Sequence, residues 1–301
     1  MKLVYQDNNT RTDKALQVVK KDTPCFDSSW HYHPEFELIF ISKSIGLRYV
    51  GDNVSNFSPG ELVLIGPYLP HLWRSDQSYY KTPGANSINT MVIKFTRNFI
   101  GEDTFDFPAF NKVNELLKMS NFGVLFDKRD SAELQEDIYG IIDLSEAERA
   151  IKLLDILNRL ARLDSKEILS TTDMRQVRTE SVNRIDKVLK FISDNYVSDI
   201  SLEDVADVAC MTTNSFCRFF KKATNKSFIT FLNEVRIKNA ARLLVQEDLP
   251  ISDVGFKVGF NSITNFNKQF KQIMNVSPNE HRFSIYADNL QRSNQTLQYV
   301  P

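Results

Sequence analysis

One pattern occurs twice in the C-terminal third of the chain. It reads SLEDVADVACMTTNSFCRFFKKATNKSF over residues 201–228 and ISDVGFKVGFNSITNFNKQFKQIMNVSP over residues 251–278. The early positions of the two copies match at an offset of 49, and the later phenylalanines and lysines match at 50. An extra residue in a turn leaves the buried faces of the flanking helices unchanged. The repeat therefore predicts two helix-turn-helix units in tandem.

Each copy carries signals for the starts and ends of its helices. Ser201 and Ser252 are expected to cap the first helices, and Thr212 and Ser262 the second ones, because their hydroxyls can accept from free backbone N–H groups. Asn225 and its counterpart Asn275 stand where a left-handed residue should end each second helix, a position that favours Gly or Asn. Small Ala206 and Gly255 allow two helices to cross closely.

The outward face of each second helix follows from a rotation of about 100° per residue. The phenylalanines of each copy share one side, and a short polar residue followed by two basic residues lies opposite. Such side chains can hydrogen-bond base edges in the major groove and neutralise phosphates. For one Arg or Lys a solvated helix face is the simpler interpretation, but the same surface in both copies favours a DNA contact. The predicted contact residues are Asn214, Cys217, Arg218, Lys221, Thr264, Asn267, Lys268 and Lys271.

The segment between the two copies predicts one rigid helix over residues 228–246. Its length of about 28 Å is close to the ~34 Å between successive major-groove openings on one side of DNA. Its apolar face also switches: Phe228 and Val235 share one side, and Ile237 and Leu244 the opposite one. A helix of this kind would pack one unit at each end.

These positions resemble the DNA-binding domain of AraC-type transcription regulators over residues 181–285. The resemblance lies in Met211-Thr212 through Phe220-Lys221-Lys222, Val235-Arg236-Ile237, Arg242-Leu243-Leu244, Ile251-Ser252-Asp253-Val254, Gly259-Phe260, Phe266, Phe270-Lys271, Val276-Ser277-Pro278 and Arg282. It implies DNA contacts by Asn214, Cys217, Arg218, Thr264, Asn267 and Lys268. The departures are Asn225 and Asn275 for Gly, Gly255 for Ala and His281 for an aromatic residue.

Charge distribution supports a nucleic-acid partner although the net charge of −1 does not. Residues 213–282 hold eleven Lys plus Arg against five Asp plus Glu in an otherwise acidic chain. Three cysteines are too few for a disulfide framework and suit a reducing cytosol. The chain shows neither an apolar leader nor an apolar run of membrane-spanning length, so the expectation is a cytoplasmic protein with no membrane partner.

Residues 1–100 predict β structure, because short alternating apolar runs are separated by Gly and Pro. Within them, strand alternation would place His31, His33 and Glu37 on one face, and His71 follows a Pro-Gly turn. This arrangement resembles the two motifs of cupin barrels, in which such side chains bind a divalent metal. Pro34 could bend the strand and spoil the shared face.

Three interpretations of this histidine cluster stay open. The first is a divalent metal held by His31, His33, Glu37 and His71; imidazole-rich sites do not choose among Zn, Fe, Mn and Ni. The second is a metal-free pocket for a small effector such as a sugar or small acid, since aromatic walls with a few polar groups suit such ligands. In the third, the cluster is a relic of the cupin family, and its histidines only form hydrogen bonds with neighbouring groups inside the barrel. The candidate effector residues are His31, His33, Glu37, Arg48, Tyr49, His71 and Trp73, with Trp30 nearby; no other cofactor is assigned.

The expected fold class is α+β and multidomain. A cupin-like effector barrel spans 1–100, a helical dimerisation region 101–164, a linker 165–180, the all-α tandem helix-turn-helix domain 181–285 and a polar tail 286–301. Ser145 and Glu148 predict a capping box at the start of a helix whose leucines cover about half its circumference. The surplus apolar surface is either a homodimer face or burial against the barrel.

The expected function is an AraC-type transcription regulator that binds double-stranded DNA, responds to a small-molecule effector and works with RNA polymerase. It is not expected to be an enzyme. The alternative is a metal-dependent cupin enzyme with an appended DNA-binding domain. The sequence does not indicate the effector, the operator, the genes controlled, or activation as against repression.

Overall fold

The computed structural model describes residues 15–26, 30–76, 78–79, 87–171, 179–246 and 249–284. The chain divides into two compact units, residues 1–186 with 223–225 and residues 187–222 with 226–301. The expected tail 286–301 lies outside the described residues, as do residues 172–178 of the expected linker.

The N-terminal unit contains two antiparallel sheets. The six-stranded sheet has the order β1-β7-β2-β5-β8-β9, and the three-stranded sheet the order β4-β3-β6. The strands are β1 (Leu16–Thr23), β2 (Phe36–Lys43), β3 (Gly46–Val50), β4 (Asn53–Phe57), β5 (Glu61–Ile65), β6 (His71–Ser75), β7 (Ile88–Phe95), β8 (Val124–Phe126) and β9 (Lys166–Ile168).

The prediction of β structure before residue 100 is confirmed, but the prediction that these strands form a barrel is not. The strands form two separate sheets, and the described residues do not close them into one barrel. The expected boundaries also miss two strands: β8 lies in the helical region, and β9 in the first residues of the expected linker. Both extend the six-stranded sheet at its β5 edge.

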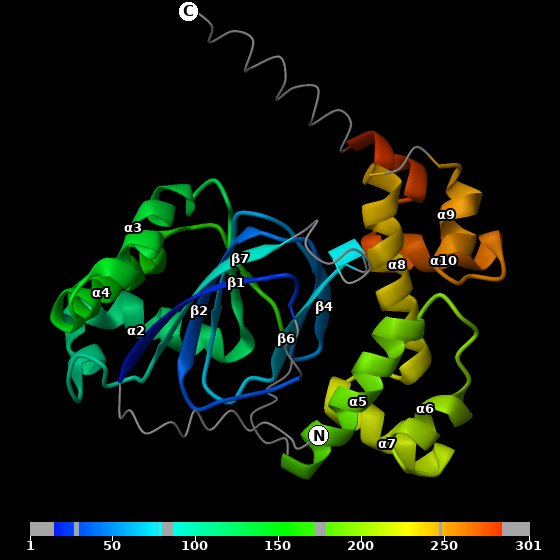
Figure 1. Ribbon diagram of the computed structural model, residues 1–301, viewed down its shortest axis with the longest axis horizontal. Coiled ribbons are helices and arrows are strands. Elements are labelled where there is room, and N and C mark those ends of the chain that lie inside the picture. The colour runs from blue at the N-terminus through cyan, green and yellow to red at the C-terminus, as the bar shows by residue number, and fades with distance from the viewer. Residues whose placement is uncertain are drawn as a thin grey trace, which may run out of the picture. The chain divides into compact units, whose positions relative to one another are not determined.

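Apolar cores cover both faces of the six-stranded sheet. Toward the three-stranded sheet, Ile39 and Val63 pack with Val50 and Trp73. The other face packs against α2 (Asn111–Met119), α3 (Gln135–Gly140) and α4 (Glu146–Arg162), which Figure 1 shows gathered on one side of the strands. Short 3₁₀ turns precede or follow these helices: Thr104–Asp106, Pro108–Phe110, Ser120–Phe122, Ala132–Leu134 and Ile141–Asp143.

Helix α4 begins with the predicted capping box, in which Ser145 accepts from the Glu148 N–H and the Glu148 side chain accepts from the Ser145 N–H. Its residues Leu153, Ile156, Leu157 and Leu160 are fully buried in the core of the unit. Most of the wide apolar face is therefore explained by burial inside the chain. Ile151 is the exception, with 66% of its surface exposed.

From residue 179 onward the described chain is built from helices and the turns between them. It contains α5 (Thr179–Asn195), α6 (Leu202–Val208), α7 (Thr213–Thr224), α8 (Phe228–Gln246), α9 (Ile251–Lys257) and α10 (Ile263–Met274). Figure 1 shows α8 running from α6 and α7 at one end to α9 and α10 at the other. The prediction of one helix over residues 228–246 is confirmed.

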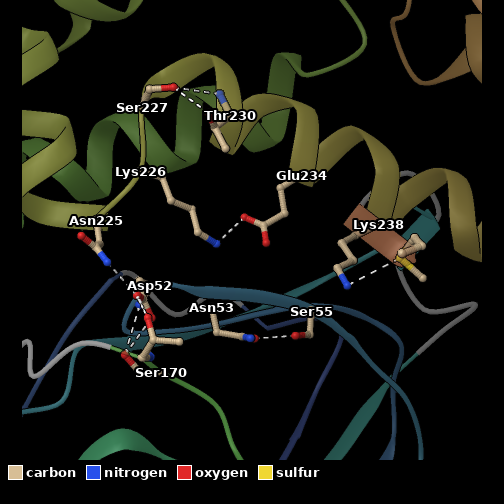
Figure 2. A network of polar contacts seen from close by, with 12 residues as sticks. Asp52, Asn53, Ser55, Ser170, Asn225, Lys226, Ser227, Thr230, Glu234 and Lys238 are labelled. Carbon is tan, nitrogen blue, oxygen red and sulfur yellow. Dashed lines mark hydrogen bonds and ion pairs between the residues drawn. The ribbon is translucent and has the colours of Figure 1, made fainter. Parts of the chain in front are cut away.

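The two ends of α8 pack against different helix-turn-helix units, as the change of its apolar face from one side to the other predicts. Phe228 and Phe231 meet Phe220 of α7 edge to face. At the other end Ala240, Ala241 and Leu244 are buried, and the Ala241 carbonyl lies 3.2 Å from Nε2 of His281. Figure 2 shows how α8 begins: the Ser227 hydroxyl accepts from the Thr230 N–H at 3.2 Å.

Three of the four predicted helix caps are confirmed. Ser201 forms a capping box with Asp204, Thr212 accepts from the N–H of Ser215, and Ser262 caps α10. The prediction for Ser252 is wrong, because Ser252 is the second residue of α9 and the N-cap is Pro250, two residues earlier. Proline without its own N–H suits a helix start, where that hydrogen would have no helical partner.

Candidate nucleic-acid interface and metal centre

The eight predicted DNA-contact residues are all exposed. Asn214, Cys217, Arg218 and Lys221 lie on α7, and Thr264, Asn267, Lys268 and Lys271 occupy the equivalent positions on α10. The opposite side of each helix is fixed in the core, where Phe216, Phe220, Phe266 and Phe270 have no exposed surface. Packing of these phenylalanines sets the rotation of each helix and leaves the polar face free.

The basic side chains of this face are not tied up in ion pairs among the described residues. Within the part of the chain that the structure describes, Arg218, Lys221, Lys268 and Lys271 form no ion pair. Lys226, by contrast, contacts Glu234 at 2.6 Å (Figure 2). Exposed cations without an internal partner can neutralise phosphate without first losing a bond.

The turns between the paired helices explain the one-residue slip of the repeat. In the first copy Cys210 has φ 53° and the Met211 N–H bonds the Ala206 carbonyl; in the second, Gly259 has φ 94° and the Phe260 N–H bonds the Gly255 carbonyl. Both pairs match at an offset of 49. Asn261 is then the inserted residue, and it lies between α9 and α10. Sequence reasoning missed that Cys210 takes a left-handed conformation, although the aligned Gly259 was a signal for it.

The helix ends behave as predicted. Asn225 and Asn275 have φ values of 58° and 60°. A Cβ on Gly255 would lie 3.1 Å from side-chain atoms of Ile263 and Phe266, which accounts for a small residue at this crossing.

Arg236 of α8 ties this helix to the end of α5 and to the second unit of the repeat. Its Nε and Nη2 donate to the carbonyls of Tyr196 and Ser198, both at 2.7 Å, and its guanidinium lies 5.8 Å from the Phe260 ring centre. Arg282 acts similarly at the far end of α8, donating to the carbonyls of Leu244 and Leu249. Both arginines belong to the quoted pattern, but their carbonyl partners could not be predicted from the residues around them.

In the N-terminal unit the structure brings three histidines and one glutamate together. His31 and His71 form an isolated antiparallel bridge, with ring centres 4.3 Å apart. The prediction of one strand through residues 31–37 is wrong, because residues 34–35 form a bend at Pro34 and β2 starts at Phe36. The four side chains nevertheless converge: one candidate ligand atom of each lies within 4.8 Å of the others, and all four residues are buried.

Backbone carbonyls orient two of the imidazole rings. His71 Nδ1 lies 2.8 Å from the Leu69 carbonyl, and His33 Nδ1 lies 3.1 Å from the Glu35 carbonyl. Both Nε2 atoms are thereby directed toward Glu37, whose Oε2 lies 2.5 Å from His33 and 3.7 Å from His71. His71 Nε2 is buried without a hydrogen-bond partner among the described residues.

The charged groups of the cluster influence one another. Burial would raise the pKa of the Glu37 carboxyl, but the hydrogen bond from His33 and the nearby imidazole of His71 hold this pKa well below its usual value. Burial lowers the pKa of His33, yet the carboxylates of Glu35 and Glu37 outweigh this and raise it. The pKa of His71 is lowered, chiefly by burial. The Glu37 carboxylate is thus anionic.

The donor set fits a divalent transition metal. Three imidazoles and one carboxylate are common ligands of such ions, and hydrogen bonds from the distal ring nitrogens to carbonyls are the usual means of orienting them. The orphaned Nε2 of His71 is the further observation in favour, because a buried acceptor without a partner is costly. A metal at this point would be bound by His31, His33, Glu37 and His71 and would supply Lewis acidity.

A second polar group lies between the two sheets. Arg48 of β3 places Nη1 2.5 Å from Glu61 of β5, and its Nε has no hydrogen-bond partner within the described ranges. Burial raises the pKa of Glu61, and the Arg48 charge only partly offsets this. Trp73 pairs in register with Arg48 and shares the core between the sheets.

One predicted effector residue, Tyr49, is placed differently from the others. Tyr49 follows Arg48 on the same strand, so its side chain leaves the opposite face of the sheet. The structure therefore does not bring Tyr49 together with the other candidate effector residues. Trp30, named only as a neighbour, is buried.

Comparison with known proteins finds a helix-turn-helix domain model that matches residues 205–283. The uncharacterized HTH-type transcriptional regulator YdeC of Bacillus subtilis (strain 168) is 21% identical over 254 residues, 82% of this chain and 84% of that protein. The HTH-type transcriptional activator RhaS of Escherichia coli O6:H1 is 22% identical over 280 residues, 89% and 92% of the two chains. The structure of ToxT from Vibrio cholerae O395 is 16% identical, covers 90% of this chain and 98% of that one, and has a TM-score of 0.35.

The matched residues 205–283 span α7 to α10, so the paired helix-turn-helix units of the structure coincide with the domain that the family model describes. The chain is similar over most of its length to HTH-type transcriptional regulators. None of the described helices is both long and apolar enough to cross a membrane.

Proposed function

We propose that the protein is a sequence-specific regulator that binds promoter DNA through the exposed faces of α7 and α10. The main support is that a polar residue and two basic residues without an ion-pair partner recur at equivalent exposed positions of both helices. Asn214, Arg218, Thr264 and Lys268 supply hydrogen bonds to base edges, and Lys221 and Lys271 neutralise phosphates. Cys217 is a weak hydrogen-bonding group, so the base opposite it is read less strictly than the base opposite Asn267.

The proposal extends to a small effector bound between the two sheets of the N-terminal unit. Support comes from the buried polar groups on the facing sides: Arg48 with its unpartnered Nε, Glu61, and the indole of Trp73. A sugar, sugar acid or small carboxylic acid matches this combination of a cation, an acceptor and an aromatic wall. The effector changes transcription only if it binds one state of the chain better than another.

A homodimer formed through α4 completes the proposal. Ile151 is 66% exposed on a helix whose residues Leu153, Ile156, Leu157 and Leu160 are buried, so its side chain can contact a second copy. Two copies would bring four reading helices to one promoter and contact RNA polymerase in the cytoplasm. Sedimentation of the full chain tests the dimer: Ile151→Asp should shift it toward monomer, and an unchanged dimer would exclude this face.

DNA binding is tested by fluorescence anisotropy with the promoter DNA upstream of the protein's own gene, across a range of salt concentrations. Arg218→Ala or Lys268→Ala should each cost about 1–3 kcal/mol of discrimination at a few bases. Lys190→Ala is the matched control, because Lys190 is exposed on α5, outside both second helices. If both variants bind like the control variant, the proposed contact faces are wrong.

Effector binding is tested by thermal unfolding of the full chain with a panel of sugars, sugar acids and small carboxylic acids. A true effector should raise the melting temperature in a saturable way, because it binds only the folded state. The double variant Arg48→Met/Glu61→Gln removes both charges of the buried pair together and should abolish the shift. Lys20→Met, at an exposed position of β1, should retain it. An equal shift in both variants would place the ligand elsewhere.

A further inference from the structure

We propose that the paired positions Cys217 and Asn267 make the two helix-turn-helix units select different base pairs. Cys217 of α7 contacts the 5-methyl group of a thymine, and Asn267 of α10 forms two hydrogen bonds with an adenine. This base preference rests on the proposed function, because it requires that the outward faces of α7 and α10 enter the major groove of DNA.

The two positions are equivalent in the structure. Helices α7 and α10 have 12 residues each, and the hydroxyls of Thr212 and Ser262 accept from the N–H three residues later at 3.4 Å in both copies. Cys217 and Asn267 are exposed, and each directly follows a phenylalanine that has no exposed surface. The two side chains therefore leave their helices in the same direction relative to the core and face the same part of the groove.

The chemistry of the two side chains differs in kind. The amide of Asn267 carries an acceptor and a donor side by side, which matches the N6 and N7 atoms of adenine. The thiol of Cys217 is a weak hydrogen-bonding group and behaves as a small apolar side chain. The apolar feature that a base pair presents in the major groove is the 5-methyl group of thymine. Within the described ranges neither side chain forms a hydrogen bond, so both are available to DNA.

The residue after each of these positions is basic. Arg218 follows Cys217, and Lys268 follows Asn267, and both are exposed on the same face as their neighbour. Either cation can bind the O6 and N7 atoms of guanine, and only arginine does so with a planar fork. The segment read by α7 should therefore combine guanine with thymine, and the segment read by α10 guanine with adenine. Although the helices are repeats, the two DNA segments differ in sequence.

The first experiment selects duplexes from a random-sequence pool with the full-length chain under reducing conditions and measures their affinity by fluorescence anisotropy. Arg218→Ala and Lys268→Ala identify the segment that each helix reads, because each should relax the selection in its own segment. Replacing the selected thymine of the first segment by uracil removes only the methyl group. Affinity should fall about fourfold, which corresponds to one methyl group no longer being buried. Cys217→Ser should abolish this difference, because a hydroxyl is polar.

A cytosine with a 5-methyl group is the second probe. At the thymine position it should bind about fourfold more tightly than unmodified cytosine, because its methyl group occupies the same place in the groove. Cys210→Gly is the matched control: it alters the other exposed cysteine of this unit, which lies outside α7, and should retain both preferences.

Exchanging the two residues tests the assignment directly. Cys217→Asn should make α7 select adenine in place of thymine, with a discrimination of about 5- to 150-fold against the other bases. Asn267→Cys should make α10 select thymine in place of adenine. Both positions are exposed, so both variants should unfold at the temperature of the unchanged protein.

Equal affinity for thymine and uracil in the unchanged protein would overturn the methyl contact. Continued selection of thymine by Cys217→Asn would overturn the assignment of this position. Failure of the proposed function looks different, because Arg218→Ala and Lys268→Ala would then bind DNA like Lys190→Ala. If these two variants lose affinity while the exchanges leave the selected bases unchanged, the base preferences alone are wrong.

Discussion

Replacing Arg236 by Ala should loosen the connection between α8, the end of α5 and the second helix-turn-helix unit. Arg236 is half-buried and donates two charge-assisted hydrogen bonds, to the carbonyls of Tyr196 and Ser198. Its ring contact with Phe260 adds a smaller attraction. The substitution therefore removes three contacts made by one side chain.

The expected loss of stability depends on how well water can replace each of the two hydrogen bonds that Arg236 donates. A hydrogen bond to a charged group contributes about 1.5–3 kcal/mol. Ser198 is exposed, so water can take over its carbonyl, whereas Tyr196 is only 8% exposed and its carbonyl is harder to resolvate. One full and one partial bond give an expected loss of about 2–3 kcal/mol in the free energy of unfolding.

Urea unfolding monitored by circular dichroism measures this loss as a lower midpoint with an unchanged slope. Arg236→Lys is the informative control: it retains the charge but cannot form the forked pair of bonds, so it should recover less than half of the loss. Amide exchange should accelerate around Gly259, whose neighbourhood includes Arg236 Nε. A loss below about 0.5 kcal/mol, the scatter of ordinary surface substitutions, would refute the role assigned to Arg236.

Three further predictions concern other parts of the chain. The double variant Lys221→Gln/Lys271→Gln should make the slope of log K against log salt shallower by about 1.8, since each lost phosphate contact changes it by about 0.9; an unchanged slope in anisotropy titrations would show that these lysines face solvent. Hydrogen bonds from basic residues of α4 lower the pKa of Asp137, so its stabilising effect is complete above the ordinary Asp pKa of about 4 and lost as the pH falls through the lowered value. Asp137→Asn should accordingly cost up to about 1 kcal/mol at pH 7 and progressively less as the pH falls through the lowered pKa, and acid titrations of both proteins check the sign. Cys210→Gly should stabilise the chain by about 0.5–1 kcal/mol because it relieves a left-handed residue at the position of Gly259, and thermal unfolding would contradict this if the variant melted lower.

The structure of the C-terminal helices could be predicted from the sequence because the pattern repeats and depends on local residues. The bounds of α8, the caps at Ser201 and Ser262 and the left-handed Asn225 depend on residues within one or two turns, so composition and spacing suffice. The wrong expectation at Ser252 arose because Pro250 supplies a helix start without any side-chain hydrogen bond.

Long-range pairing set the limit in the N-terminal half. Strands β8 and β9 have three residues each; β8 pairs with the edge of β5 and β9 pairs with β8, and nothing in their own sequence reveals these distant partners. The histidine cluster was expected for the wrong reason: alternation along a strand breaks at Pro34, and the bridge between His31 and His71 restores the convergence. Arg48 and Tyr49 could not share a pocket, because neighbours on a strand point to opposite sides.

If α7 and α10 bind promoter DNA as proposed, α8 also limits which spacings between the two bound DNA segments are compatible with binding. Its 19 residues form an uninterrupted rod of about 28 Å, with no hinge at which one reading helix could swing relative to the other. Adding one base pair between the two recognised segments would rotate the farther one by about 35° around the duplex axis, and the rod has no means of following. On such DNA the protein should lose all contacts of one helix-turn-helix unit at once. Base changes within each segment should therefore weaken binding gradually, whereas a change in the distance between the segments should weaken it abruptly.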